Sequence, residues 1–239
     1  MKGTLFGVGV GPGDPELMTL KAHRILSEAH IVAVPKTAWD KDSLALSIAQ
    51  QAVGPDKEIL ELLFPMTHNQ AQLQESWDQA ALTLSTYLDQ GKTVAFITLG
   101  DPSLYSTYLY LHHRAREKGY RTEIISGVPS FCAAAGALGL GLAENRESVA
   151  VVPSVDEWGH LKEVLANFDT IVLMKVAKNL PRLKVLLQEQ GLLDKSVLVS
   201  RCGMAEEAFV YHWGDLADQG TKVSYFSTMI VKKSGVKQP

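Results

Sequence analysis

The chain has 239 residues, of which 46% are hydrophobic and 21% are charged, so it can form one large or two modest globular domains. A formal net charge of -3 argues against a dedicated nucleic-acid-binding protein, and no apolar run approaches the roughly 18 residues of a membrane span. The two cysteines, Cys132 and Cys202, lie far apart in the sequence, which favours reduced thiols over a disulfide framework. We therefore expect a cytoplasmic protein that binds neither nucleic acid nor a membrane.

Apolar strand-like runs alternate with helical patterns through the first half of the chain. Strands are expected at residues 3–9, 30–34, 58–62 and 93–99, and helices at 15–28, 43–52, 69–89 and 103–117. This alternation predicts a parallel sheet with helices on its faces. The polar segment 114–121 is the expected boundary, which gives domains of residues 1–117 and 118–239.

The second half has a different pattern of connections. Strands are expected near 121–126, 148–153, 170–175, 196–201, 208–213 and 223–232, and helices near 131–140, 156–167 and 180–190. The connections between the last three strands are short, which predicts antiparallel pairing. The predicted fold class is therefore α/β, with two α/β domains, a parallel sheet in the first and a mixed sheet in the second.

The segment from Gly7 to Pro15 (GVGVGPGDP) closes the first strand and is rich in glycine. Glycine lets the backbone approach a ligand closely and adopt positive φ. The segment does not match the dinucleotide fingerprint, because Pro12 or Asp14 stands where the third glycine belongs, and no Gly-Lys-Ser/Thr phosphate loop is present. Both a ligand-binding turn and a tight turn without a ligand remain open, and Asp14 is also a good helix N-cap.

Two further turns follow strand-like runs and contain glycine. Gly100-Asp101-Pro102-Ser103 follows the strand at 93–99, and Ser126-Gly127-Val128-Pro129-Ser130 follows the strand near 121–126. Ligands of open parallel sheets bind beyond the carboxyl ends of the strands, where these turns are expected. Asp101 can cap the following helix or face a ligand, and the two roles are compatible.

Other catalytic patterns are missing from the sequence. The seven histidines form no His-Glu-x-x-His motif, so a catalytic metal held by the protein is not expected. A Gly-x-Ser-x-Gly elbow with a plausible histidine is also missing, which disfavours nucleophilic hydrolysis.

Five segments, taken in order, resemble the tetrapyrrole (corrin/porphyrin) methyltransferases that use S-adenosylmethionine: residues 7–22, 98–108, 126–131, 172–175 and 225–231. The resemblance covers essentially the whole chain. Within this family, the segment Phe64–Thr67 with Trp77, and the Tyr-Phe-Ser-Thr run from Tyr225, are most similar to the precorrin-2 methyltransferases that act at carbon 20. The resemblance thus implies methyl transfer to carbon 20 of precorrin-2 or cobalt-precorrin-2 in cobalamin biosynthesis.

The resemblance also implies a homodimer of two-domain subunits, with S-adenosylmethionine and the tetrapyrrole in a cleft between the domains. The implied cofactor contacts are Pro12, Gly100, Asp101, Leu104, Pro129, Ser130, Met174, Gly203, Met204 and Thr228. The candidate catalytic residues are Asp101, which would orient or polarise the cofactor, and Tyr225, which would face the macrocycle. The substrate carries acetate and propionate groups, so the cations at predicted strand ends are candidates to bind it: Lys36, Lys175, Lys178 and Arg201.

Other functions remain open at this point. The same chemistry at another position, on uroporphyrinogen III or a later precorrin, or in a diphthine-forming relative, is a close alternative. A non-catalytic nucleotide-binding module and a purely structural protein are more distant ones, and the missing third glycine argues against the former.

Overall fold

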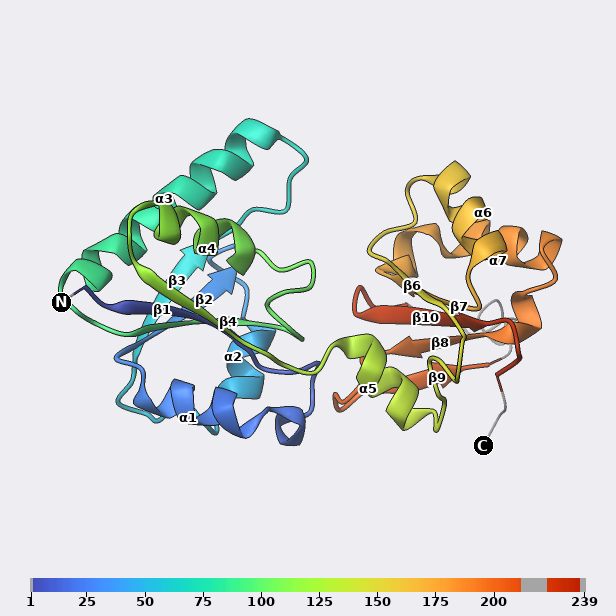
Figure 1. The fold of residues 1–239 in the computed structure, drawn as a ribbon, viewed down its shortest axis with the longest axis horizontal. Helices are drawn as coiled ribbons and strands as arrows, with labels where there is room; N and C mark the ends of the chain where they lie inside the picture. The colour runs from blue at the N-terminus through green and yellow to red at the C-terminus, as the bar shows by residue number, and fades with distance from the viewer. Residues whose placement is uncertain (1, 212–222, 237–239) are drawn as a thin grey trace. The chain divides into compact units, whose positions relative to one another are not determined.

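The computed structural model describes residues 2–211 and 223–236 (Figure 1). The chain forms two compact units, Met1–Pro129 and Ser130–Pro239, and each is described by itself.

The first unit contains a five-stranded sheet in the order β3-β2-β4-β1-β5. Its strands are β1 (Thr4–Gly9), β2 (Ile31–Lys36), β3 (Glu58–Leu63), β4 (Val94–Thr98) and β5 (Arg121–Ile125). Every pair in this sheet is parallel, which confirms the prediction for the first half of the chain.

The division between the units lies later than the boundary that the sequence predicts at residues 117 and 118. The strand expected to open the second domain is β5, and it pairs along its length with β1 of the first sheet. The compact units therefore divide after Pro129, beyond the turn that follows β5. The polar segment 114–121 is the end of a helix and a short turn inside the first unit.

Helices cover both faces of this sheet (Figure 1). They are α1 (Leu20–Glu28), α2 (Leu44–Ala49), α3 (Gln70–Asp89) and α4 (Tyr108–Glu117). Buried side chains of α1 and α2 pack with one set of strand residues, and those of α3 and α4 pack with the other set. This division follows from the alternation of side chains along each strand.

Two helices begin later than the sequence pattern indicates. The predicted helix 15–28 consists of a 3-10 turn, Pro15–Leu17, and then α1. Asp14 caps the turn by accepting from the Glu16 N–H at 2.8 Å, whereas Thr19 caps α1. The predicted helix 103–117 begins at Tyr108, so Asp101 lies in a loop and does not cap α4. Residues 99–107 are thus available as a long loop at the carboxyl end of β4.

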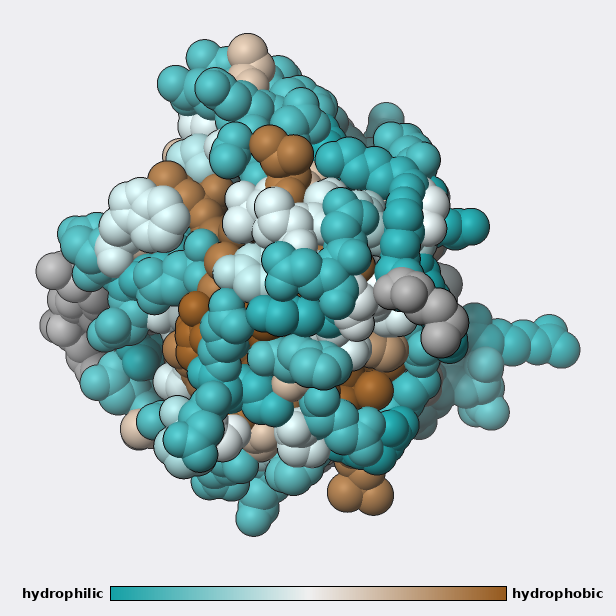
Figure 2. Space-filling view, turned by 90° about the vertical axis from the view of Figure 1, so that its left-hand side faces the viewer, coloured by the Kyte–Doolittle hydropathy of each residue, from teal (hydrophilic) through white to brown (hydrophobic). Residues whose placement is uncertain are grey.

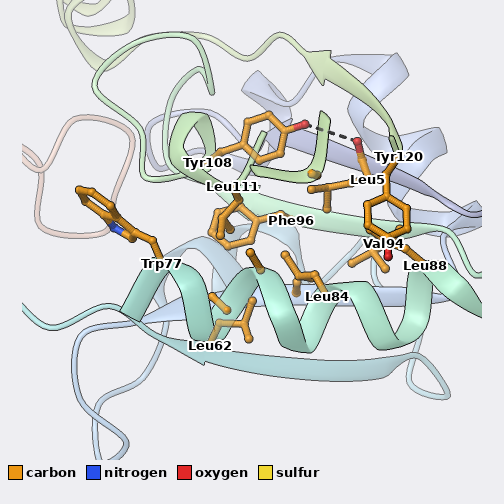
Figure 3. Close-up of a cluster of buried hydrophobic side chains, with 14 of the residues drawn as sticks. Leu5, Leu62, Trp77, Leu84, Leu88, Val94, Phe96, Tyr108, Leu111 and Tyr120 are labelled. Carbon is orange, nitrogen blue, oxygen red and sulfur yellow. Dashed lines mark hydrogen bonds between the residues drawn. The ribbon is translucent and has the colours of Figure 1, made fainter. Parts of the chain in front are cut away.

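A tyrosine explains one of the glycines of the first strand. Tyr108 is fully buried in the cluster of Figure 3, and its hydroxyl donates to the Glu123 carbonyl at 3.0 Å and to the Leu5 carbonyl at 3.4 Å. A Cβ on Gly7 would lie 2.2 Å from the Tyr108 ring. Gly7 is therefore needed for packing, because the ring lies directly on the backbone of β1.

The second unit contains a five-stranded sheet in the order β6-β7-β10-β8-β9, and this sheet is mixed, as the sequence predicts. The strands are β6 (Val149–Val152), β7 (Thr170–Met174), β8 (Ser196–Ser200), β9 (Ala208–Val210) and β10 (Ser227–Lys232). β6 and β7 are parallel, while β10 runs antiparallel to both β7 and β8 and lies between them (Figure 1). β9 is antiparallel to β8, and residues 212 and 213 of its predicted span lie outside the described residues.

Helices also cover both faces of the second sheet. They are α5 (Ser130–Ala137), α6 (Trp158–Asn167) and α7 (Leu180–Glu189). α6 and α7 pack in one buried cluster, and α5 packs in another. Within the described ranges, no helix is long and apolar enough to cross a bilayer. On the face shown in Figure 2, hydrophobic residues form separate patches between hydrophilic ones.

Candidate functional site

The connections of the first sheet create a point where a ligand is expected. The chain leaves β1 toward β2 on one side, and it leaves β4 toward β5 on the other side. Because β1 and β4 are neighbours, the loops at their carboxyl ends lie at a topological switch point, where open α/β sheets bind ligands. These loops are the glycine-rich turn and the turn that begins at Gly100.

The two turns are joined through their backbones. The Gly100 N–H donates to the Gly11 carbonyl at 2.8 Å, and the Gly11 N–H donates to the Gly100 carbonyl at 3.4 Å. Both glycines have positive φ, of +83° at Gly11 and +67° at Gly100. A Cβ on Gly100 would meet no atom of another residue closer than 3.7 Å, so this glycine is required by its conformation and not by crowding.

The third turn packs against the other two. A Cβ on Gly127 would lie 2.1 Å from the Gly100 carbonyl oxygen, and a Cβ on Gly9 would lie 2.5 Å from the same atom. No side chain fits at these positions, because both neighbours are backbone. Gly9 and Gly127 are therefore explained by the contact of the turns with one another, which the sequence alone did not indicate.

Asp101 fastens this arrangement. One of its carboxylate oxygens accepts from the Gly127 N–H at 3.0 Å. The other oxygen accepts from the Ser103 N–H at 2.7 Å and from the Ser103 hydroxyl. A carboxylate has about four acceptor sites, so Asp101 can accept one further hydrogen bond after these three. Its position is thus fixed by the turns, and its remaining capacity suits the orientation of a ligand more than proton transfer.

The second unit gathers its candidate cofactor residues at one edge of its sheet. β7 and β8 both run antiparallel to β10, so their carboxyl ends lie at the same edge. Met174 is the last residue of β7 and lies opposite Thr228 on β10. Gly203, with φ of +72°, and Met204 follow β8, and the Met204 N–H donates to the Arg201 carbonyl at 3.0 Å. Four residues expected from the resemblance are thereby brought to one edge.

The candidate substrate residues of the second unit lie at this same edge. Lys175 and Arg201 directly follow β7 and β8, and each has a φ of 55°. The Lys175 ammonium lies 5.9 Å from the centre of the Tyr225 ring. The Arg201 N–H donates to the Phe226 carbonyl at 2.9 Å. Lys178 lies one turn farther along, in the 3-10 helix Val176–Asn179.

Lys36 has other contacts. It ends β2 in the first unit, and only 9% of its side chain is exposed. Its ammonium donates to the Trp39 carbonyl at 2.8 Å and pairs with the Glu61 carboxylate at 3.1 Å. The side chain is therefore used in holding a loop of the first unit, in contrast to the exposed Lys175.

The Cys202 thiol is not activated as a nucleophile, and the described residues form no metal-binding cluster. Burial, and then a hydrogen bond with Glu207, raises the pKa of the Cys202 thiol to about 12, so the thiol is protonated and a poor nucleophile at neutral pH. Among the described residues, no group of three histidine, cysteine or acidic side chains could hold a metal ion.

Tyr105 is a further candidate site residue that the sequence did not indicate. This residue lies in the loop after β4, is 51% exposed and has a φ of 51°, which is uncommon for a bulky side chain. Nothing in the sequence marks a tyrosine for this conformation. Its only signal is its place within the segment 98–108 that carries the resemblance.

The family model of the Tetrapyrrole (Corrin/Porphyrin) Methylases matches residues 4–216 of the chain. The chain belongs to this family. Two curated relatives of this tetrapyrrole methylase match over nearly their whole length. The cobalt-precorrin-2 C(20)-methyltransferase of Salmonella typhimurium is 36% identical over 233 residues, which are 98% of each chain. The precorrin-2 C(20)-methyltransferase of a Sinorhizobium species is 31% identical over 237 residues, which are 96% of this chain and 95% of the relative.

Solved structures share the fold of this tetrapyrrole methylase. A cobalt precorrin-4 methyltransferase matches with a TM-score of 0.75 at 22% identity, covering 96% of this chain and 94% of the other. A uroporphyrin-III C-methyltransferase from Thermus thermophilus, complexed with S-adenosyl homocysteine, matches with a TM-score of 0.67 at 21% identity, covering 97% and 98%. At these identities the likeness establishes the two-unit α/β fold alone.

Proposed function

We propose that this chain transfers the methyl group of S-adenosylmethionine to carbon 20 of precorrin-2 or cobalt-precorrin-2 in cobalamin biosynthesis. One observation carries the proposal: relatives named for this reaction are 31% and 36% identical over nearly their full length. The family model independently supports methyl transfer to a tetrapyrrole.

The residues present fit S-adenosylmethionine. The Gly11 and Gly100 N–H groups are used in the hydrogen bonds between the two turns, so the loops of the first unit offer the remaining lone pairs of these two carbonyls and one further acceptor position on Asp101. The edge of the second sheet offers Met174 and Thr228. Apart from the Asp101 carboxylate these groups carry no charge, and one negative group suits a ligand whose sulfonium and amino groups are positive. The cofactor contacts that the resemblance implies are all proposed on this basis, including Pro129, the last residue of the first unit, and Ser130, the first residue of the second.

When bound, S-adenosylmethionine supplies a methyl group already activated on a positive sulfur. The chain must then align carbon 20 with the methyl group and exclude water, so positioning and electrostatics dominate. The residues around the macrocycle would hold carbon 20 in line with the methyl group, and the proton that carbon 20 gives up after methylation would leave to a weak base or water. We assign the orienting role to Asp101 and the macrocycle contact to Tyr225.

The carboxylates of the substrate require cations. Lys175, Lys178 and Arg201 at the edge of the second sheet are proposed to supply them, together with the sequence candidate Lys36. The contacts of Lys36 with Trp39 and Glu61 make it the weakest of the four, because a substrate would have to break them first.

We also propose a homodimer located in the cytoplasm. Leu20, Met66 and Trp39 are 91%, 68% and 60% exposed, and a second subunit would bury such apolar side chains favourably. Both cysteines are free, which suits a reducing compartment. Sedimentation equilibrium at micromolar concentration tests the dimer, and a single species at the monomer mass of 26.1 kDa would contradict it.

The decisive experiment is turnover of metal-free and cobalt-loaded precorrin-2 side by side, with S-adenosylmethionine labelled with carbon-13 in the methyl group. We expect one labelled methyl group at carbon 20, read by NMR. Label at another carbon would support the alternative position, and no label with either substrate would refute the proposal. Calorimetric titration with NADH, ATP and S-adenosylmethionine distinguishes the nucleotide-binding alternative, which predicts tight binding of the nucleotides alone.

A further inference from the structure

The edge of the second sheet places two cations around an aromatic pair. Lys175 follows β7, Arg201 follows β8, and Tyr225 and Phe226 precede β10, which lies between them. Neighbouring strands are about 4.8 Å apart, so the backbones of Lys175 and Arg201 are separated by about 10 Å. Two strand ends at this backbone spacing can each present a cation to a different carboxylate of one ring, which suits such a molecule more than a single small anion.

The backbone at both cations is strained in the same way. Four described residues other than glycine have positive φ: Tyr105, Asn145, Lys175 and Arg201. Two of them, Lys175 and Arg201, follow strands β7 and β8, which are separated only by β10 in one sheet. Side chains rarely adopt this conformation, and it is found preferentially where a function requires a fixed direction. Lys175 and Arg201 thus have their directions set by strain at the position where the resemblance expects a substrate.

Arg201 makes incomplete use of its guanidinium. Its Nη1 pairs with the Glu206 carboxylate at 3.2 Å, and its Nε is buried without a hydrogen-bond partner. Arginine binds a carboxylate best through two parallel N–H donors, and a buried unpaired donor is unfavourable. Glu206 is 75% exposed, so its pair with Arg201 is weak and easily exchanged.

We propose that Glu206 holds the Arg201 guanidinium until a substrate carboxylate replaces it. Once Glu206 is displaced from Nη1, the guanidinium turns so that its buried Nε also faces the incoming carboxylate, which accepts from Nε and one Nη together, while Lys175 binds a second carboxylate beside the Tyr225 ring. This subsite deepens the proposed function, on which its choice of a polycarboxylate tetrapyrrole rests. Glu206 then disfavours ligands without a carboxylate, because such ligands would break the Arg201–Glu206 ion pair without replacing it.

The test measures the affinity for uroporphyrin, a stable tetrapyrrole with eight carboxylates, by quenching of protein fluorescence. Arg201→Gln is expected to weaken binding about tenfold or more, because hydrogen bonds to charged groups are lost. Arg201→Lys should recover only a small part of this loss, since lysine lacks the planar fork. Lys175→Gln is expected to weaken binding by about fivefold or less. Lys195→Ala, at the opposite end of β8, is the matched control and should bind normally.

Glu206→Gln gives the distinctive result. We expect it to tighten uroporphyrin binding about two- to fivefold, because Arg201 becomes free. In the Arg201→Gln background the same change should have no such effect, as a double-mutant cycle would show. Equal tightening in both backgrounds would mean a general charge effect and would overturn the proposal, as would weaker binding by Glu206→Gln alone.

Two measurements separate this proposal from others. Two controls show whether each variant remains folded: its affinity for S-adenosylhomocysteine and its thermal midpoint. If Arg201→Gln loses both, Arg201→Lys takes its place in the comparison. If the wild type fails to methylate precorrin-2 but its uroporphyrin affinity depends on Arg201 and Glu206, the subsite stands and the proposed reaction fails. Normal methylation with no dependence on Arg201 or Glu206 overturns the subsite alone.

Discussion

At the scale of single residues, the glycines of the three turns have different causes. Gly7 makes room for the Tyr108 ring, and Gly9 and Gly127 allow the turns to touch. Gly11 and Gly100 instead have positive φ with more space around them. Glycine frequency alone cannot separate packing, conformation and ligand access, because all three are consequences of the missing Cβ.

The contact of the turns can be tested at Gly127. Gly127→Ala is expected to destabilise the protein by about 1–3 kcal/mol, because its methyl group would lie 2.1 Å from the Gly100 carbonyl oxygen. Gly136→Ala is the matched control: Gly136 lies in α5 with no atom of another residue within 4 Å of the added Cβ, and alanine favours a helix. Urea unfolding measures both, and equal midpoints for the two variants would contradict the crowded contact.

The role of Asp101 can be tested in the same way. Asp101→Asn replaces one acceptor oxygen with an amide NH2 group, which can only donate, so either the Gly127 N–H or the Ser103 donors lose a partner. We expect the KM for S-adenosylmethionine to rise about tenfold, which is the effect of one lost charge-assisted hydrogen bond. Ser103→Ala keeps the carboxylate and should have a smaller effect.

The pH profile distinguishes orientation from proton transfer at Asp101. If Asp101 only orients the cofactor, Asp101→Asn keeps the wild-type shape of the kcat profile against pH, measured at saturating S-adenosylmethionine. Loss of an acidic limb of kcat in Asp101→Asn, with an unchanged KM, would show instead that Asp101 acts as a base.

At the scale of elements, the sequence predicted most strands and helices because hydrophobic periodicity is a local property. It placed the start of α4 at residue 103 and not at Tyr108, because residues 103–107 contain no glycine or proline, whereas the hydrogen bond from Gly127 to Asp101 that holds the loop is distant in sequence. It also failed to predict the pair of Lys36 with Glu61, which depends on β2 and β3 lying side by side. Candidate site residues were found where a strand end marked them, whereas Tyr105 and Glu206 carry no local signal.

The ion pair between Lys232 and Glu147 predicts how stability depends on pH. Lys232 of β10 is buried, and its ammonium donates to the Gly141 carbonyl at 2.7 Å and to the Glu147 carboxylate at 2.8 Å. The hydrogen bond from Lys232, and then that from the Glu144 N–H, lowers the pKa of Glu147 below its ordinary 4.5. The resulting stability is fully present above pH 4.5 and is lost as the pH falls through the lower value of the folded state.

Glu147→Gln should therefore flatten the decline of stability below pH 4.5 relative to the wild type, when urea midpoints are measured from pH 3 to 7. Glu189→Gln, at the end of α7, is the control and should keep the decline of the wild type. If the urea midpoints of Glu147→Gln and the wild type fall equally with pH, the Lys232–Glu147 pair does not titrate in this range.

At the scale of the whole molecule, the position of β5 decides how the chain divides. β5 pairs with β1, and the Tyr108 hydroxyl donates to the Glu123 carbonyl within it. A fragment of residues 1–117 would lack this strand, exposing the edge of β1 and leaving the Tyr108 hydroxyl with its two longer contacts, to the Leu5 carbonyl at 3.4 Å and to His112 Nδ1 at 3.5 Å. A fragment of residues 1–129 keeps β5 and both core clusters of the first unit.

We therefore expect the fragment 1–129 to unfold cooperatively in urea, followed by circular dichroism, and the fragment 1–117 to show no cooperative transition or to aggregate. Removing the edge strand exposes backbone donors and acceptors of β1 together with apolar side chains such as Val8, which lies opposite Ile125 and is fully buried in the intact chain. Cooperative unfolding of 1–117 with the midpoint of 1–129 would instead restore the earlier boundary, because β5 would then contribute nothing to the stability of the first sheet.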